Sequence, residues 1–244
     1  MVDFLKMEKV CIIIPAYNEE KRIGRTLEEY GRFFKELKRE KNLDFEILVV
    51  LNACRDDTLG VVKKYQQKFK EISFLDFEAG GKGFAIIEGF KYSLKKNYNL
   101  IGFVDSDLAT SPQSFYELIK NIGVYNGIIA SRWLKESIIK TKQTLLRRIT
   151  SRGFNFIVRT LFLIPYKDTQ CGAKLLKKEV IQKITPELNL TKWSFDVNLL
   201  YLCNKSGFKI KEHPTTWEDQ PESKINLIKA PFQMFLGVIK LRIM

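Results

Sequence analysis

The 244-residue sequence has little of the residue types that many catalytic and structural centres require. Its single histidine, His213, excludes a three-histidine zinc centre, a paired-histidine zinc helix and a two-histidine iron site. A serine–histidine–aspartate triad would have to use His213, and the Gly-x-Ser-x-Gly motif that presents such a serine is absent. The four cysteines lie far apart without Cys-x-x-Cys spacing, so we expect free thiols in a reducing, cytosolic environment.

Long apolar runs are also lacking. The first ten residues do not contain the apolar core of a signal peptide. No segment reaches the roughly 18 apolar residues of a membrane-spanning helix, and the nearest, residues 154–165, is interrupted by Arg159. With 45% hydrophobic and 28% charged residues, the composition is that of a folded protein. We expect a single catalytic domain over residues 1–224, and a C-terminal amphipathic helix over 225–244 that docks either on the core or on a membrane.

Positive charge predominates, with 41 lysines and arginines against 28 acidic residues and a net charge of +13. This excess suits anionic partners, namely nucleic acid, phosphorylated molecules or an acidic membrane surface. A basic nucleic-acid-binding protein is the remote alternative. The basic residues are spread along the chain and no helix-turn-helix, zinc finger or RNA-binding aromatic motif is recognisable, so we expect no nucleic-acid partner.

The first half of the chain alternates apolar runs with amphipathic segments. This pattern predicts strands at 10–14, 45–51, 72–77 and 100–104, and helices at 19–40, from Asp56 or Asp57 to about 70, and at 82–96. In the second half it predicts helices at 112–121, 144–163 and 195–206, and strands at 127–131, 173–176 and 208–213. Strands alternating with helices indicate an α/β fold with a mostly parallel sheet and helices on both faces.

Polar clusters follow three of the predicted strands, at residues 15–19, 52–57 and 105–107. Parallel sheets bind ligands beyond the carboxyl ends of their strands, so these clusters indicate an active site. Asp105 and Asp107 can converge on Mg²⁺ or Mn²⁺, which takes one or two carboxylates together with water and substrate phosphate oxygens. A solvated loop or a helix cap is the alternative for this pair.

A glycine-rich segment, Gly80-Gly81-Lys82-Gly83, precedes the helix predicted at 82–96. It is not a P-loop, because Gly83 stands where serine or threonine should follow the lysine, and it lacks the dinucleotide-binding glycine pattern. Glycines still let the backbone approach a ligand closely, and a lysine at a helix N-terminus suits a phosphate. A plain loop with a solvated lysine is the alternative.

Four sequence blocks occur in an order that resembles the family 2 glycosyltransferases: CIIIPAYNEE, VDSD, DTQCGAKLLKKE and KWSFDVNLLYL. The resemblance runs from about Val10 to Lys224 and is greatest to the polyprenyl-phosphate sugar synthases, particularly the dolichyl-phosphate β-glucosyltransferase group. It implies a glycosyltransferase-A fold and a nucleotide-diphospho-sugar donor. It also implies inverting transfer of a hexose to a polyprenyl (dolichyl) phosphate.

The resemblance implies roles for individual residues. The nucleotide-sugar would be bound by Pro15, Ala16, Tyr17, Glu19, Asn52, Asp56, Gly81, Lys82, Asp105, Ser106, Asp168, Gln170 and Gly172. Asp105 and Asp107 would hold the metal, and Asp196 would take the position of the catalytic base, with Asp107 and Arg132 as the other catalytic residues. The acceptor phosphate would be bound by Arg132, Arg148 and Arg152, although a solvated helix face is the alternative for the last two.

One departure concerns the donor. Where related enzymes typically carry an aspartate that holds the base, this chain has Asn52, and an amide can donate as well as accept a hydrogen bond. UDP-glucose is the first expectation for the donor and GDP-mannose the second. A saccharide or protein hydroxyl acceptor, which would make Asp196 an obligatory base, is the alternative to a lipid phosphate. The lipid acceptor implies a peripheral enzyme at the cytoplasmic face of a membrane.

Overall fold

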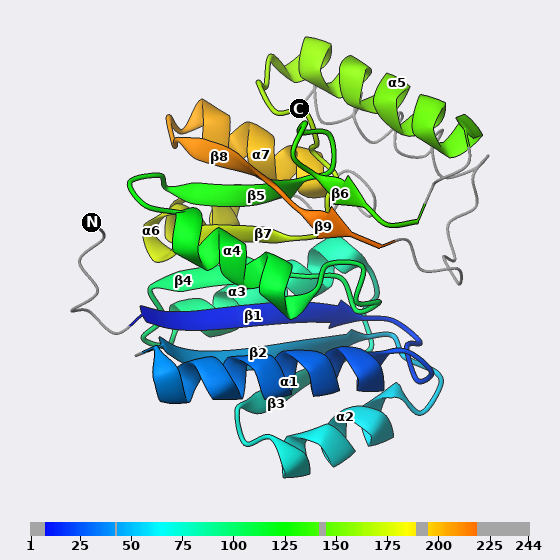
Figure 1. Ribbon diagram of the computed structural model, residues 1–244. Coiled ribbons are helices and arrows are strands. Elements are labelled where there is room, and N and C mark those ends of the chain that lie inside the picture. The colour runs from blue at the N-terminus through cyan, green and yellow to red at the C-terminus, as the bar shows by residue number, and fades with distance from the viewer. Residues whose placement is uncertain (1–7, 42, 142–144, 189–194, 219–244) are drawn as a thin grey trace.

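A computed structural model describes residues 8–41, 43–141, 145–188 and 195–218, so the helix expected at 225–244 lies outside the described residues. Its centre is a seven-stranded sheet in the order β3-β2-β1-β4-β7-β5-β8 (Figure 1). The strands are β1 (Glu8–Ala16), β2 (Leu43–Asn52), β3 (Ile72–Phe77), β4 (Leu100–Phe103), β5 (Gly127–Ser131), β7 (Lys174–Lys177) and β8 (Ile210–Pro214). Only β7 runs antiparallel to its neighbours in this sheet, so the predicted α/β class with a mostly parallel sheet is confirmed.

Helices cover both faces of the sheet (Figure 1). They are α1 (Ile23–Glu40), α2 (Thr58–Lys68), α3 (Lys82–Leu94), α4 (Pro112–Asn121), α5 (Leu145–Phe162), α6 (Lys178–Ile184), the short 3₁₀ helix η1 (Thr185–Glu187) and α7 (Phe195–Lys205). One core cluster joins the sheet to α1, α2 and α4, and the other joins it to α3, α6 and α7. Burial on both faces explains why β1 and β2 read as continuous apolar runs rather than alternating ones.

The helix α5 contributes a third, smaller cluster beside β5 and α7. Figure 1 shows α5 at the end of the molecule that lies farthest from α1 and α2. Two short strands, β6 (Ile138–Ile139) and β9 (Thr216–Trp217), form a separate parallel pair. Among the described residues, no helix combines the length and the apolarity that crossing a bilayer requires.

Most predicted elements are present, with shifts at their ends. The strands at 72–77 and 127–131 and the helix at 112–121 have the predicted bounds. The first helix begins at Ile23 rather than at Glu19, because residues 19–22 form a turn in which the Glu19 carbonyl accepts hydrogen bonds from the N–H groups of Arg22 and Ile23. Of the two predicted caps for α2, Asp57 occupies the N-cap position and accepts a hydrogen bond from Gly60. The elements β6, β9, α6 and η1 were not predicted.

Candidate active site

The carboxyl ends of β1 and β2 are tied to the glycine-rich loop by one side chain. Asn52, which is 2% exposed, donates from Nδ2 to the Ala16 carbonyl at 2.8 Å. Its Oδ1 accepts a hydrogen bond from the N–H of Gly81 at 2.9 Å. Gly81 has a φ of +133°, a conformation open to glycine and strained for other residues. The amide at position 52 therefore holds the loop that presents Lys82, and both its donor and its acceptor are engaged.

The segments that follow β1 and β2 enclose a hollow of about 450 Å³, lined by Asn18, Glu19, Glu20, Lys21, Arg22, Arg55 and Asp56. Asp56 accepts hydrogen bonds from the N–H groups of Glu20 and Thr58, both at 3.2 Å, so it joins the two loops that form the hollow. Pro15 and Ala16 are buried in β1, whereas Tyr17 is half exposed at its end. Among Pro15, Ala16 and Tyr17, Tyr17 is therefore the residue whose side chain a ligand can reach.

Lys82 joins two carboxylates from different elements. Its Nζ lies 2.7 Å from Oδ1 of Asp105 and 3.7 Å from Oδ2 of Asp196. Burial alone would lower the pKa of Lys82, but the negative charges of Asp105 and Asp196 raise it, so the amine carries a positive charge at neutral pH. Lys82, Asp105 and Asp196, three predicted site residues that are distant in sequence, thus lie together at the carboxyl edge of the sheet.

The loop that carries Asp105 is closely packed. The hydroxyl of Thr26 donates to the carbonyl of Ser106 at 2.7 Å, which fixes the loop on α1. A Cβ added at Gly172 would lie 1.9 Å from Oδ2 of Asp105, so any other residue there would displace the Asp105 carboxylate. The predicted pocket residue Gly172 therefore sets the position of a predicted metal ligand.

The donor set formed by Asp105 and Asp107 fits a hard divalent cation. Burial, together with the negative charge of Asp105, raises the pKa of Asp107 to about 6, as expected for carboxylates that share a partly desolvated site. Within the described ranges, no cluster of three or more histidine, cysteine or acidic side chains can hold a metal by itself. Two carboxylates suit Mg²⁺ or Mn²⁺, which completes its shell with water and substrate phosphate oxygens.

Asp196, at the start of α7, is held by a residue that the sequence analysis missed. Lys174 is fully buried in β7, and its Nζ donates to Oδ1 of Asp196 at 2.6 Å and to the Cys171 carbonyl at 2.7 Å. Burial alone would raise the pKa of Asp196, but the charges of Lys174 and Lys82 hold it below its usual value. The available signal was that Lys174 is the only charged residue in the apolar run 171–176.

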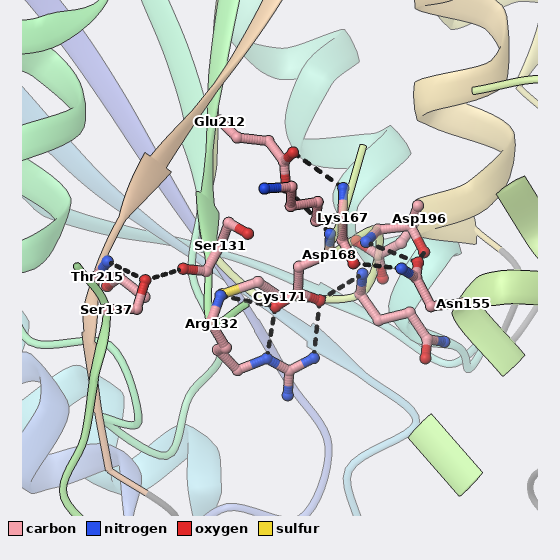
Figure 2. A network of polar contacts seen from close by, with 12 residues as sticks. Ser131, Arg132, Ser137, Asn155, Lys167, Asp168, Cys171, Asp196, Glu212 and Thr215 are labelled. Carbon is pink, nitrogen blue, oxygen red and sulfur yellow. Dashed lines mark hydrogen bonds and ion pairs between the residues drawn. The ribbon is translucent and has the colours of Figure 1, made fainter. Parts of the chain in front are cut away.

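Arg132 and Asp168 form a second buried pair, shown in Figure 2. The Arg132 side chain donates to Asp168 through Nε at 2.7 Å and through Nη2 at 2.9 Å, and its backbone N–H donates at 2.9 Å. The Gln170 N–H also donates to Asp168, at 3.3 Å. Burial alone would raise the pKa of Asp168, but the adjacent guanidinium lowers it. The pair fixes both the arginine and the loop that runs from Asp168 to Gly172.

Two further residues that sequence reasoning missed support this loop (Figure 2). The carboxylate of Glu212 accepts the N–H groups of Lys167 at 2.9 Å and Asp168 at 3.0 Å. The Oδ1 of Asn155 accepts the hydroxyl of Thr169 at 2.9 Å. Glu212 gives no signal in the sequence, whereas Asn155 could have been noticed as a polar residue next to the apolar side of α5.

Aromatic rings extend the basic part of the site towards α5. The Arg132 guanidinium lies 5.7 Å from the ring centroid of Trp133 and 5.4 Å from that of Trp217. The Arg152 guanidinium lies 4.9 Å from the Trp133 ring. Two of the predicted acceptor arginines thus share one aromatic side chain. The Arg148 side chain lies outside the described part of the structure.

The chain is similar to known proteins over most of its length. The glycosyl transferase family 2 model matches residues 11–185. The chain is 32% identical to a dolichyl-phosphate β-glucosyltransferase of Dictyostelium discoideum, with 96% of this chain and 73% of the relative covered. It is 29% identical to the dolichyl-phosphate β-glucosyltransferase of Homo sapiens, with the same coverage of 96% and 73%.

A solved structure shares the fold. It is the glucosyl-3-phosphoglycerate synthase of Mycobacterium tuberculosis in complex with Mn²⁺, uridine diphosphate and phosphoglyceric acid, with a TM-score of 0.65, 15% identity, and coverage of 96% of this chain and 78% of that chain. The predicted glycosyltransferase-A architecture is therefore confirmed. The family model, which covers most of the residues that build the sheet edge described above, shows that the chain belongs to glycosyltransferase family 2.

Proposed function

We propose that this chain is a metal-dependent, inverting hexosyltransferase that moves glucose from UDP-glucose to a polyprenyl phosphate such as dolichyl phosphate. The observation that carries the proposal is the junction of Lys82, Asp105 and Asp196 at the carboxyl edge of the sheet. The relatives named dolichyl-phosphate β-glucosyltransferase, similar over nearly the whole chain, support the choice of sugar and acceptor.

The donor diphosphate binds beside the glycine-rich loop. Asp105 and Asp107 are the residues that would hold Mg²⁺ or Mn²⁺, and such an ion neutralises charge on a diphosphate leaving group. Lys82, whose pKa is raised, adds a positive charge at the N-terminus of α3, where backbone N–H groups also favour phosphate. The nucleoside occupies the region of Tyr17, Glu19 and Asp56.

The acceptor needs orientation more than it needs a base. A phosphate monoester has a second pKa near about 6, so at neutral pH it is largely a dianion and already nucleophilic. One of its oxygens attacks the anomeric carbon while the bond from that carbon to the diphosphate oxygen breaks, which inverts the configuration. Arg132 and Arg152 bind the acceptor phosphate, and Asp196, kept ionised by Lys174 and Lys82, orients the sugar or the acceptor.

A polyprenyl acceptor places the reaction at a membrane surface. The net charge of +13 suits the anionic cytoplasmic leaflet, and we assign the enzyme to that face as a peripheral protein.

The test uses radiolabelled UDP-glucose with purified protein, with and without dolichyl phosphate and with and without Mn²⁺ or Mg²⁺. Label should enter the organic phase only when lipid phosphate and a divalent cation are both present. A parallel reaction with GDP-mannose decides the donor, because transfer of mannose in place of glucose would overturn the assignment of UDP-glucose.

The variant Asp196→Asn separates lipid phosphate from a hydroxyl acceptor. With a phosphate acceptor we expect a modest decrease in kcat. General-base catalysis contributes about 10²–10⁴-fold to the rate. If a saccharide or protein hydroxyl accepted glucose efficiently, and kcat with that acceptor fell by this factor in Asp196→Asn, the result would favour the alternative acceptor.

A further inference from the structure

The outer side of α5 carries exposed apolar residues. The inner side packs Phe154, Val158 and Phe162 against β5 and α7. On the outer side Phe156 is 69% exposed, and Leu163, the first residue after the helix, is 81% exposed. These large apolar side chains, exposed on one side of the helix, are available for contact with something outside the molecule.

Cations alternate with these apolar side chains. Arg152, Phe156, Arg159 and Leu163 are all exposed and follow one another at intervals of four, three and four residues, the spacing of one helix face. We call these four residues the α5 stripe. Figure 1 shows α5 at the periphery, and its inner side packs against β5. A helix face that mixes aromatic, aliphatic and cationic residues is typical of helices that lie in a membrane interface.

The backbone of Leu163 is also unusual. Its φ is +51°, in the left-handed region where a residue with a Cβ is strained and where glycine usually ends a helix. This conformation ends α5 and leaves the leucine side chain exposed and available for an apolar contact outside the molecule.

The charge of the surrounding segment identifies the chemistry of the partner. Residues 137–167 contain seven lysines and arginines and no acidic residue. The chain's own segment 219–244 has four lysines and arginines against two acidic residues, so its charge does not complement this face. A second copy of the chain would present the same positive face. Anionic lipid headgroups do complement it.

We propose that the α5 stripe docks on an anionic lipid surface, with Phe156 and Leu163 inserted at the interface. Because Arg152 contacts Trp133 and Trp133 contacts Arg132, the docked face adjoins the pair of arginines that bind the acceptor phosphate. A lipid phosphate can then reach Arg132 while its chain stays in the bilayer, a consequence that rests on the proposed function.

The first test is co-sedimentation with phosphatidylcholine vesicles that either contain or lack phosphatidylserine. The wild type should bind the phosphatidylserine vesicles, and the double variant Phe156→Asp/Leu163→Asp should bind at least about tenfold more weakly. Arg159→Gln should bind about fivefold more weakly. The matched control is Val124→Asp, because Val124 is 90% exposed and lies before the amino end of β5, outside α5, and this variant should bind like the wild type.

The variant Leu163→Gly separates docking from a structural role. Glycine relieves the strain at φ +51°, so Tm should stay the same or rise while vesicle binding weakens. A lower Tm with unchanged binding would overturn the proposal. So would wild-type affinity in Phe156→Asp/Leu163→Asp, or dissociation of a wild-type dimer in that variant, which would make a second copy the occupant of the surface.

Transfer assays keep this proposal distinct from the proposed function. The double variant should transfer glucose normally to a detergent-solubilised dolichyl phosphate and poorly to the same lipid in vesicles. If the wild type binds vesicles through the α5 stripe but transfers glucose in neither format, the proposed function fails and the docking surface stands. If the double variant loses transfer equally in both formats, the docking surface fails.

Discussion

At the scale of single residues, the buried cation Lys174 is the feature with the clearest energetic consequence. Its amine, buried on β7, donates hydrogen bonds to Asp196 at 2.6 Å and to the Cys171 carbonyl. We expect Lys174→Met to lower the free energy of unfolding by about 3–5 kcal/mol, because a buried carboxylate then loses its nearest cation. Denaturant titration measures this loss.

A double-mutant cycle is the control. In an Asp196→Asn background the amide needs no cation, so Lys174→Met should cost less than it does in the wild type. Equal costs in the two backgrounds would mean that Lys174 stabilises the strand by packing and does not act on Asp196.

Asn52 is the second residue whose role the structure makes specific. Its amide donates to Ala16 and accepts from Gly81, and a carboxylate can do only the second. Asn52→Asp should therefore destabilise the protein by about 1–3 kcal/mol, because the Ala16 carbonyl loses its hydrogen bond from position 52 and a charge is buried beside it. Thermal melts measure the effect. If the variant kept its stability and bound UDP more tightly, recognition of the base would outweigh this structural role.

At the scale of elements, the segment that precedes β7 approaches the end of β4 closely. The Cβ introduced by Gly172→Ala would overlap the carboxylate of Asp105, so that carboxylate must move. We expect kcat/KM to fall about 10–100-fold with little change in Tm, as for other changes next to metal ligands. The control is Gly153→Ala in α5, where nothing lies within 4 Å of an added Cβ and stability should rise by up to about 1 kcal/mol. Unchanged kcat/KM in Gly172→Ala would show that the position of Asp105 does not matter for transfer.

The elements differ in how far the sequence predicts them. The β2 and β4 runs could be read from local patterns because most of their residues are buried on both faces and polar turns follow them. The strand β7 was predicted near its place, but its antiparallel direction depends on pairing with β4 and β5, far along the chain. The strands β6 and β9 are two residues long, too short to show any periodicity.

At the scale of the whole molecule, the sheet topology explains which parts of the site could be predicted. Asp105, Asp107 and Glu19 follow strands that run parallel to one another, and Asn52 ends such a strand, so their position at one edge of the sheet followed from the prediction of a mostly parallel sheet. The supporting contacts of Lys174, Glu212 and Asn155 join β7, β8 and α5, and depend on tertiary packing that no local pattern encodes. The roles of the predicted residues in binding and catalysis stay predictions that the experiments above decide.

Acid stability is a whole-molecule property that the buried ion pairs determine. Burial raises the pKa of both Asp168 and Asp196. The positive charge of Arg132 beside Asp168, and those of Lys174 and Lys82 beside Asp196, outweigh this effect and hold each pKa below the usual 3.8. Each pair therefore stabilises the fold fully above about pH 4, and this stability is lost as the pH falls through the lower pKa of the folded state. We expect Tm to decline steeply below about pH 4. Asp168→Asn, though less stable at neutral pH, should decline less over the same interval, because its side chain takes up no proton on unfolding. An identical acid slope in the variant and the wild type would show that the Arg132–Asp168 pair contributes nothing to acid stability.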